Sequence, residues 1–294
     1  MRRAVFGLIT LAALAGATAW MLSGPQPLDS AAIAGLSGGD AESGRAVYLA
    51  AGCASCHMAP GTDADPLLLS GGRQFESDFG TFLAPNISPD PDHGIGGWTQ
   101  EQFLNAVMRG ISPDGKHYYP AFPYTSYIRA EPQDIADLYA YMMTLPADAT
   151  PSQPHDLGFP FNIRRSVGLW KWLYLREDWI VTGDLTEAET RGRYLSEALA
   201  HCAECHTPRG ALGALDHDRW LMGAPNPSGR GRIPAIAGDS FTWSAFDISA
   251  YLASGLTPDF DVVGGSMAPV VNNLRQLDRA ELDAIAAYIL RAGQ

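Results

Sequence analysis

CASCH at residues 53–57 and CAECH at residues 202–206 repeat one pattern: two cysteines three positions apart, with a histidine directly after them. These two segments contain all four cysteines of the 294-residue chain. The pattern is typical of covalent haem attachment, in which both thiols bond the porphyrin and the histidine ligates the iron. The sequence therefore predicts two covalently bound haem c groups. The attachment residues are Cys53, Cys56, Cys202 and Cys205, and the first axial ligands are His57 and His206.

Two other uses of a CxxC pair explain the sequence less well. A four-cysteine zinc site usually brings its two pairs within about 20 residues of each other, whereas these pairs lie 149 residues apart. A thioredoxin-like redox pair needs only one copy and gives the histidine no role. If haem uses all four cysteines, none remains for a disulfide or a catalytic thiolate.

The sequence around the motifs forms an internal repeat. A helix-like segment precedes each motif, at 40–52 and 186–201, and an amphipathic segment closes each half, at 131–146 and 277–292. Between them, matching residues stand at a constant offset of 145. The pairs are Trp98 and Trp243, Gly110 and Gly255, Pro113 and Pro258, and Asp114 and Asp259.

Each half thus follows the order helix, CxxCH, loop, helix, loop, helix, which resembles a class I cytochrome c domain. A domain this small buries only a modest core of its own, and a porphyrin would complete it. We expect a mainly α, loop-rich fold of two tandem cytochrome c-like domains, preceded by one transmembrane helix or signal segment. The expected boundaries are 1–23 for the anchor or signal, 24–39 for a flexible tether, 40–147 for domain 1, 148–184 for a connector and 185–294 for domain 2.

The N-terminus has the pattern of an export segment. Two arginines precede an uncharged apolar run at 4–22, which indicates a positive-inside orientation. A cleaved signal would use the small residues at 17–19, whereas an uncleaved anchor would span about 28 Å as a helix. We favour the anchor, because the run exceeds the usual length of a signal core. Either reading places the body on the periplasmic side of the bacterial inner membrane.

The second axial ligand differs between the halves. Met267, in the loop before the last helix, stands where cytochrome c domains carry a distal methionine, and the alternative is a methionine that only fills a gap. The offset of 145 places Phe122 at the matching position, and a phenyl ring cannot coordinate iron. Either His117 or another residue replaces the ligand, or the first haem is five-coordinate with Phe122 over its open face. The other candidates are Met108, Met142, Met143, His93 and His155, of which Met142 and Met143 match core positions.

Several further residues are candidate haem contacts. Trp98 and Trp243 begin matching helices and would pack on haem or in the core. Arg230 and Arg232 suit the propionates, or they lie in a solvated loop. Pro85 and Pro234 have the same separation as the two motifs and would accept a hydrogen bond from the histidine ring, with Pro208 as another candidate in the second half. The basic, aromatic segment 164–176 would pack between domains or rest on an anionic membrane.

The net charge of −12 argues against nucleic acid as a partner and suits docking on basic patches of redox proteins. Segments 80–127, 154–175 and 201–216 resemble the cytochrome c subunits of membrane-bound periplasmic dehydrogenases for alcohols, gluconate and related substrates, over nearly all of 40–294. The resemblance implies electron transfer from a dehydrogenase towards the respiratory chain. Such subunits commonly carry three haems, and several have methionine at the position of Phe122, so the chain departs from them in both respects.

Three functions compete at this stage. The first is an electron carrier or subunit without substrate chemistry of its own. The second is a diheme enzyme with an open first haem, such as a peroxidase or a thiosulfate dehydrogenase; against it, no free cysteine remains and no acid–base pair stands out near 119–124. The third is a membrane-tethered donor to a terminal oxidase or a photosynthetic reaction centre, which differs from the first only in its partner.

Overall fold

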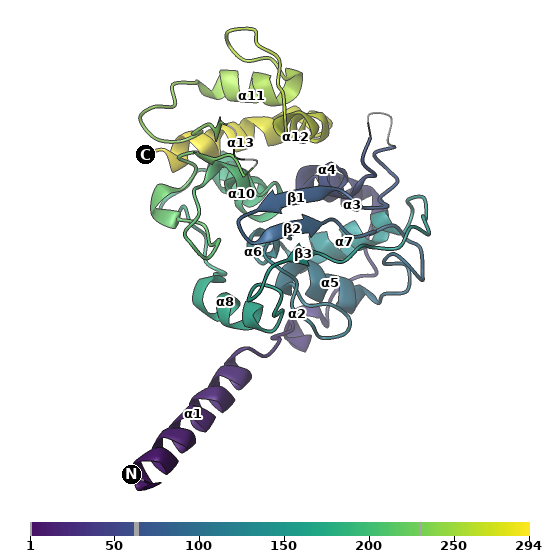
Figure 1. Cartoon of the computed structure of the whole chain (residues 1–294). Helices are drawn as coiled ribbons and strands as arrows, with labels where there is room; N and C mark the ends of the chain where they lie inside the picture. The colour runs from purple at the N-terminus through teal and green to yellow at the C-terminus, as the bar shows by residue number, and fades with distance from the viewer. Residues whose placement is uncertain (1, 62–64, 228, 230) are drawn as a thin grey trace.

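Two helical domains lie against each other, and an isolated helix projects from the first (Figure 1). The computed structural model describes residues 2–61, 65–227, 229 and 231–294. Strands are few and short within these residues, so the predicted mainly α, loop-rich class is confirmed. The strands are β1 (Gln74–Ser77), β2 (Gly80–Leu83), β3 (Asp156–Leu157), β4 (Ala224–Pro225) and β5 (Arg232–Ile233).

The two domains repeat one order of helices. Domain 1 contains α3 (Ala41–Ala51), α4 (Cys53–His57), α5 (Gln100–Arg109), α6 (Tyr124–Tyr127) and α7 (Pro132–Met142). Domain 2 contains α9 (Glu187–Arg193), the π-helix η1 (Tyr194–Leu199), α10 (Ala203–His206), the 3-10 turn η2 (His217–Arg219), α11 (Ala245–Ser254), α12 (Met267–Leu274) and α13 (Arg279–Ala292). Among the described residues, three helices begin with a capping box, which satisfies backbone N–H groups left free in the first turn. The capping residues are Thr99, Thr186 and Ser244.

The first and last helices of each domain cross at a glycine. A Cβ on Gly44 of α3 would lie 1.9 Å from the carbonyl oxygen of Asp137 in α7. A Cβ on Gly192 of α9 would lie 1.9 Å from the carbonyl oxygen of Ala284 in α13. Backbone-to-backbone contact of this kind leaves no room for any side chain. The close crossing fixes the first helix of each domain, after which the CxxCH motif follows in the chain, against the last helix.

We expect Gly44→Ala to destabilise the holoprotein by about 1–3 kcal/mol, the range for forcing extra atoms into a packed contact. The added methyl group must push α3 away from α7. Denaturant unfolding measures the effect. Gly35→Ala is the matched control, because no heavy atom lies within 4 Å of a Cβ built there. Equal stability of the two variants would contradict the crossing.

Most of the buried apolar residues of both domains form one contiguous cluster. Glu197 of η1 lies inside it and is 1 % exposed. Its carboxylate accepts hydrogen bonds from the backbone N–H groups of Ile180 (2.8 Å) and Val181 (3.0 Å) and from the hydroxyl of Tyr288 (2.7 Å). One acidic side chain therefore joins the connector, the last helix and the segment that leads into the second motif.

Glu197→Ala is expected to lower the free energy of unfolding by about 2–4 kcal/mol, because it leaves buried donors without acceptors. Glu187→Ala removes an exposed carboxylate ten residues earlier and serves as the control. Denaturant titration of both holoproteins, followed by the haem absorbance, makes the comparison. A loss no larger in Glu197→Ala than in Glu187→Ala would show that the network contributes nothing to stability.

The connector adds structure to domain 1. Its strand β3 pairs antiparallel with β2, with Gly80 opposite Leu157 and Thr81 opposite Asp156. Its helix α8 (Ser166–Tyr174) lies beside the end of α1 (Arg2–Leu22), as Figure 1 shows. Among the described residues, one helix, Val5–Leu22 within α1, has the length and composition of a membrane span, and it is entirely unburied. A secretory signal has the same properties.

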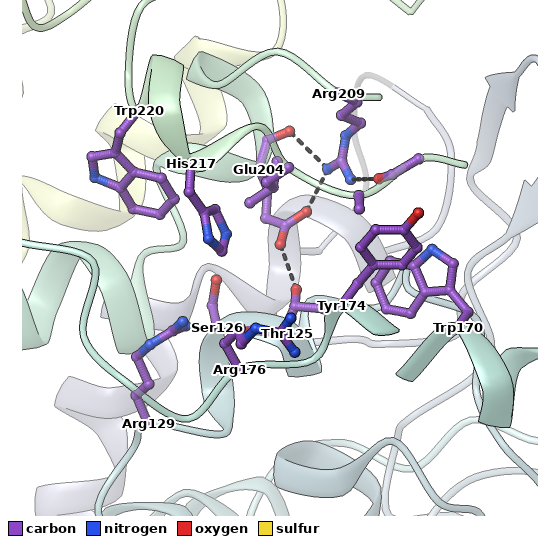
Figure 2. Close-up of a pocket in the computed structure, with 13 residues that line it drawn as sticks. Thr125, Ser126, Arg129, Trp170, Tyr174, Arg176, Glu204, Arg209, His217 and Trp220 are labelled. Carbon is purple, nitrogen blue, oxygen red and sulfur yellow. Dashed lines mark hydrogen bonds and ion pairs between the residues drawn. The ribbon is translucent and has the colours of Figure 1, made fainter. Parts of the chain in front are cut away.

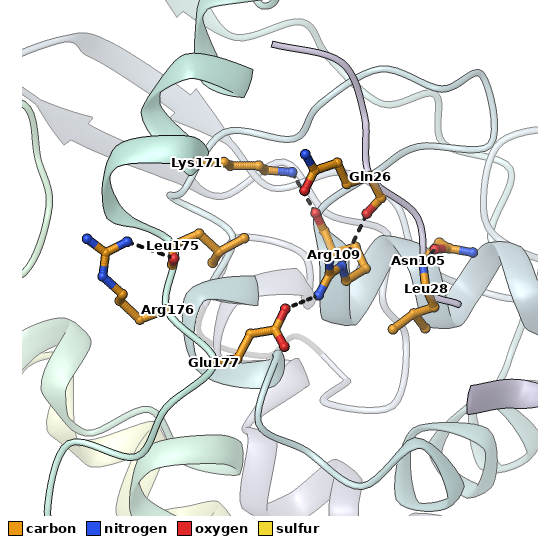
Figure 3. Close-up of polar contacts among 8 residues, drawn as sticks. All are labelled: Gln26, Leu28, Asn105, Arg109, Lys171, Leu175, Arg176 and Glu177. Carbon is orange, nitrogen blue, oxygen red and sulfur yellow. Dashed lines mark hydrogen bonds and ion pairs between the residues drawn. The ribbon is translucent and has the colours of Figure 1, made fainter. Parts of the chain in front are cut away.

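Segment 24–39 differs from the flexible tether indicated by its composition. The backbone N–H of Leu28 donates to Asn105 Oδ1 (2.8 Å), and Arg109 Nε donates to the carbonyl of Gln26 (3.1 Å), as Figure 3 shows. Further along, the short helix α2 (Ser30–Ile33) forms, and the N–H of Ser37 donates to the side chain of Gln133. The segment packs on domain 1 because its backbone groups find partners on α5 and α7.

Candidate haem sites

Each CxxCH motif forms a short helical turn that puts both cysteines on one side. In domain 1 the motif is α4, and in domain 2 Cys202 caps α10. Removal from water raises the pKa of Cys53 to about 12 and that of Cys202 to about 11. Thiols with such a pKa stay protonated at neutral pH and are poor nucleophiles, which argues against a reactive redox pair. Among the described residues, no three His, Cys, Asp or Glu side chains gather as a metal site, so the zinc alternative has no support.

The motif histidines are oriented by proline carbonyls. His57 Nδ1 lies 2.9 Å from the carbonyl oxygen of Pro85, and His206 Nδ1 lies 2.8 Å from that of Pro234. A carbonyl oxygen only accepts hydrogen bonds, so Nδ1 carries the proton and the lone pair stays on Nε2. Such a bond fixes both the tautomer and the ring orientation of a ligating histidine. The structure thus pairs His57 with Pro85 and His206 with Pro234, as their spacing predicts. The carbonyl of Pro208, the other candidate, accepts from the N–H of Asp216 instead.

The distal loops of the two domains have the same backbone hydrogen bonds. The N–H of Tyr118 donates to the carbonyl of Gly110 at 2.7 Å, and the N–H of Val263 donates to that of Gly255 at 2.7 Å. The two loops are therefore aligned at Tyr118 and Val263, which stand four residues before Phe122 and four residues before Met267. Met267 is partly buried and packs against the core at the start of α12. Phe122 lies at the equivalent point before α6.

His117 occupies the position of Val262 in this repeat. Ile111 forms an isolated β-bridge with His117, and Leu256 forms the same bridge with Val262. Val262 is 76 % exposed, so this position faces the surface of its domain. His117 is only 3 % exposed because the end of α1 covers it, and its Nε2 lies 2.9 Å from the carbonyl oxygen of Ser23. The imidazole therefore contacts the N-terminal segment, on the outside of domain 1.

The remaining candidates for the first distal ligand are dispersed. His93 is exposed, and His155 Nδ1 accepts a hydrogen bond from the N–H of Leu83, the last residue of β2. Met108 is buried in α5, Met142 is buried in α7, and Met143 caps α7.

Phe122 instead sits among aromatic rings, with edge contacts to three tyrosines. They are Tyr118 (5.9 Å between centroids), Tyr127 (6.0 Å) and Tyr124 (6.3 Å).

Of the residues expected to contact haem, the two tryptophans pack on the core and Arg232 is exposed. Trp98 and Trp243 precede α5 and α11 and are packed against the core, and Trp243 has an edge contact with Tyr251 at 5.3 Å. Arg232 is exposed in β5, and Arg230 lies outside the described residues. Arg73 is a residue that sequence reasoning missed: its Nη1 donates to the carbonyl of Ser55, inside the first motif, at 2.5 Å. Arg73 belongs to no motif and has no counterpart in the repeat, so no spacing in the sequence pointed to it.

The two motifs lie at the interface between the domains. Ser55, inside the first motif, accepts a hydrogen bond from Asn273 of α12 at 2.9 Å. Glu204, inside the second motif, accepts one from Thr125 of domain 1 at 2.6 Å and pairs with Arg209, as Figure 2 shows. Next to the second motif, His201 Nε2 lies 3.2 Å from the carbonyl oxygen of Ala51, which precedes the first. Residues of each attachment motif thus contact the opposite domain.

This repeated geometry defines a two-domain haem protein, and comparison with known proteins agrees. The cytochrome c family model matches residues 41–146 and 190–292, one match in each domain. The chain therefore belongs to the cytochrome c family, whose members carry haem c and transport electrons. It is 53 % identical over 292 residues to a diheme cytochrome c-type protein of Cereibacter sphaeroides, covering 99 % of this chain and 98 % of that protein.

Three further relatives are cytochrome subunits of dehydrogenases. The chain is 39 % identical to the fructose dehydrogenase cytochrome subunit of Gluconobacter japonicus, covering 84 % of the chain and 51 % of that subunit. It is 33 % identical to the alcohol dehydrogenase (quinone) cytochrome c subunit of Gluconobacter oxydans, covering 81 % and 51 %. It is 32 % identical to the gluconate 2-dehydrogenase cytochrome c subunit of Pantoea cypripedii, covering 90 % and 63 %. The chain thus spans about half to two thirds of the length of these subunits, and the expected resemblance to them is confirmed.

Proposed function

We propose that the chain binds two haem c groups covalently and relays electrons from a dehydrogenase to an acceptor on the periplasmic side of the membrane. The observation that carries this is the meeting of both attachment motifs at one domain interface, with Ser55 bonded across it in one direction and Glu204 in the other. Groups attached at such neighbouring sites can exchange electrons within one molecule. The dehydrogenase-subunit relatives support a dehydrogenase as the donor.

The residues present fit haem c. Cys53 and Cys56, and Cys202 and Cys205, would form the thioether bonds, and the Nε2 lone pairs of His57 and His206 would face the irons. Bound haem supplies reversible one-electron exchange at iron. The protein's part is to hold each imidazole through Pro85 or Pro234 and to exclude water with the aromatic and aliphatic core.

We infer that the two haems differ in their distal ligands. Met267 would ligate the second iron, whereas Phe122 takes the ligand position over the first and His117 is held by Ser23. Thioether ligation favours ferrous iron and raises the reduction potential. The higher potential then belongs to the second haem, and electrons run from the first haem to the second.

A combined measurement tests this function. Magnetic circular dichroism with EPR on the oxidised protein should show one methionine-ligated haem and one high-spin haem. A redox titration should give two separated midpoints, and a substrate-loaded dehydrogenase should reduce both haems rapidly. Two indistinguishable midpoints would contradict the directed relay. Turnover of peroxide by the isolated protein would favour a diheme enzyme instead, and rapid oxidation by a terminal oxidase or a reaction centre would identify the acceptor.

We also propose that α1 is retained as a membrane anchor. In support, the end of α1 has partners in the folded body, through His117 and Arg165. The intact mass of the mature protein decides between anchor and signal. A chain that begins at Met1 agrees with an anchor, and one that begins at Trp20 would overturn it.

A further inference from the structure

The segment that joins α1 to domain 1 is closely packed and hydrogen-bonded. The carbonyl of Ser23 accepts from His117 Nε2 at 2.9 Å, and its hydroxyl accepts from Arg165 Nε at 2.9 Å. Gly168 of α8 approaches so closely that a Cβ there would lie 2.1 Å from the Ser23 carbonyl oxygen. Directly after Ser23, the backbone of Gln26 and Leu28 is bonded to α5 (Figure 3). The body is therefore fixed to the last turn of α1.

The last turn of α1 contains a tryptophan, a residue typical of the membrane interface. Trp20 stands two residues before the end of the helix, and tryptophan is enriched where the lipid headgroups begin. Arg165 stacks over its indole ring at 4.3 Å and donates to its carbonyl at 2.7 Å. If Val5–Leu22 spans the bilayer, these contacts place Arg165 at the level of the lipid phosphates.

An exposed apolar surface lies on one side of this junction. It is formed by the turn before α8 and by α8 itself, which lies beside the end of α1 in Figure 1. The most exposed members are Phe159 at 81 % and Trp172 at 58 %. We call this the junction surface, and its other members are Ile163 and Leu173. Tyr174 also belongs to α8, but it lines the pocket shared with Arg209 and Trp220 of domain 2. Large exposed apolar patches mark contact with a partner or a membrane.

We propose that the junction surface rests in the headgroup layer of the bilayer that α1 spans. This inference depends on the retention of α1 proposed above. Lipid is favoured over a protein partner because the surface is continuous with the anchor and because aromatic side chains suit the headgroup region. The surface would hold domain 1 on the membrane in one orientation and domain 2 away from it.

Lipid photo-crosslinking of the full-length holoprotein in nanodiscs tests the proposal. The nanodiscs contain phosphatidylcholine, phosphatidylglycerol and a phospholipid with a diazirine in its acyl chain close to the headgroup. Peptide mass spectrometry should find lipid adducts on 159–174 at roughly ten times the level on 246–262, because only the first segment meets the headgroup layer. The second segment is the internal control, since Phe246 and Val262 are exposed apolar residues on domain 2.

Two matched variants sharpen the result. Trp172→Ser should reduce the adducts on its own peptide several-fold, and Phe246→Ser should leave them unchanged. The haem absorbance of each variant reports that the fold is intact. Equal adduct levels on the two segments of the wild-type protein, or a mature chain that begins at Trp20, would overturn the proposal. Redox titration of the same nanodiscs reports separately on the electron relay, so failure of one proposal is distinguishable from failure of the other.

Discussion

Replacing Phe122 with methionine is expected to raise the reduction potential of the first haem by on the order of 0.1 V, a fraction of the roughly 0.8 V range that axial ligands cover. The shared backbone bonds at Tyr118 and Val263 place residue 122 where Met267 stands in the second domain. A thioether at that point would reach the iron and favour its ferrous state. The two midpoints would then converge, and the high-spin signal in EPR would disappear.

Phe122→Leu is the control for this change, because it alters the side chain without supplying a ligand. Its spectrum should stay high-spin at the first haem, with a potential close to that of the wild type. His117→Ala gives a second comparison. Because the His117 ring is hydrogen-bonded to Ser23, this substitution is expected to leave the spectrum of the first haem unchanged. Loss of a low-spin signal in His117→Ala would show that the imidazole ligates iron and that the relay needs a different explanation.

Replacing Met267 with leucine is expected to lower the potential of the second haem by a similar amount, on the order of 0.1 V. Leucine preserves the volume and the packing at the start of α12 but offers no lone pair to iron. The near-infrared charge-transfer band of thioether-ligated ferric haem should vanish, and a second high-spin signal should appear. Because the downhill step to the second haem would be lost, reduction of the acceptor should slow while reduction by the donor persists.

Met222→Leu is the matched control, because Met222 is a half-exposed thioether in the same domain. It should leave both midpoints and the charge-transfer band unchanged. A charge-transfer band that survives in Met267→Leu would exclude Met267 as the ligand of the second haem. Spectroelectrochemical titration of the two variants, side by side with the wild type, makes the comparison.

The residues of the haem sites were predictable to different degrees. The CxxCH motifs and the alignment of Phe122 with Met267 follow from spacings along the chain, and the loops of the two domains indeed have the same backbone bonds. The prediction for Pro85 and Pro234 is also confirmed, because each proline stands 28 residues after the histidine that its carbonyl contacts. His117 was harder to place. Its residue type suggested a ligand, and only the path of residues 20–28 across domain 1 shows that Ser23 holds its ring.

The sequence by itself determined the two attachment motifs, the internal repeat and the mainly α class, because each follows from residue types and their spacing along the chain. The tertiary structure decided which distant segments pack against each other. Segment 24–39, which its composition indicates to be a tether, instead packs on domain 1 through hydrogen bonds to Asn105 and Arg109 of α5. The tertiary structure also brought Ser55 and Glu204 to one interface, although 149 residues separate them. Such contacts depend on how whole domains pack, and no local pattern in the chain specifies that geometry.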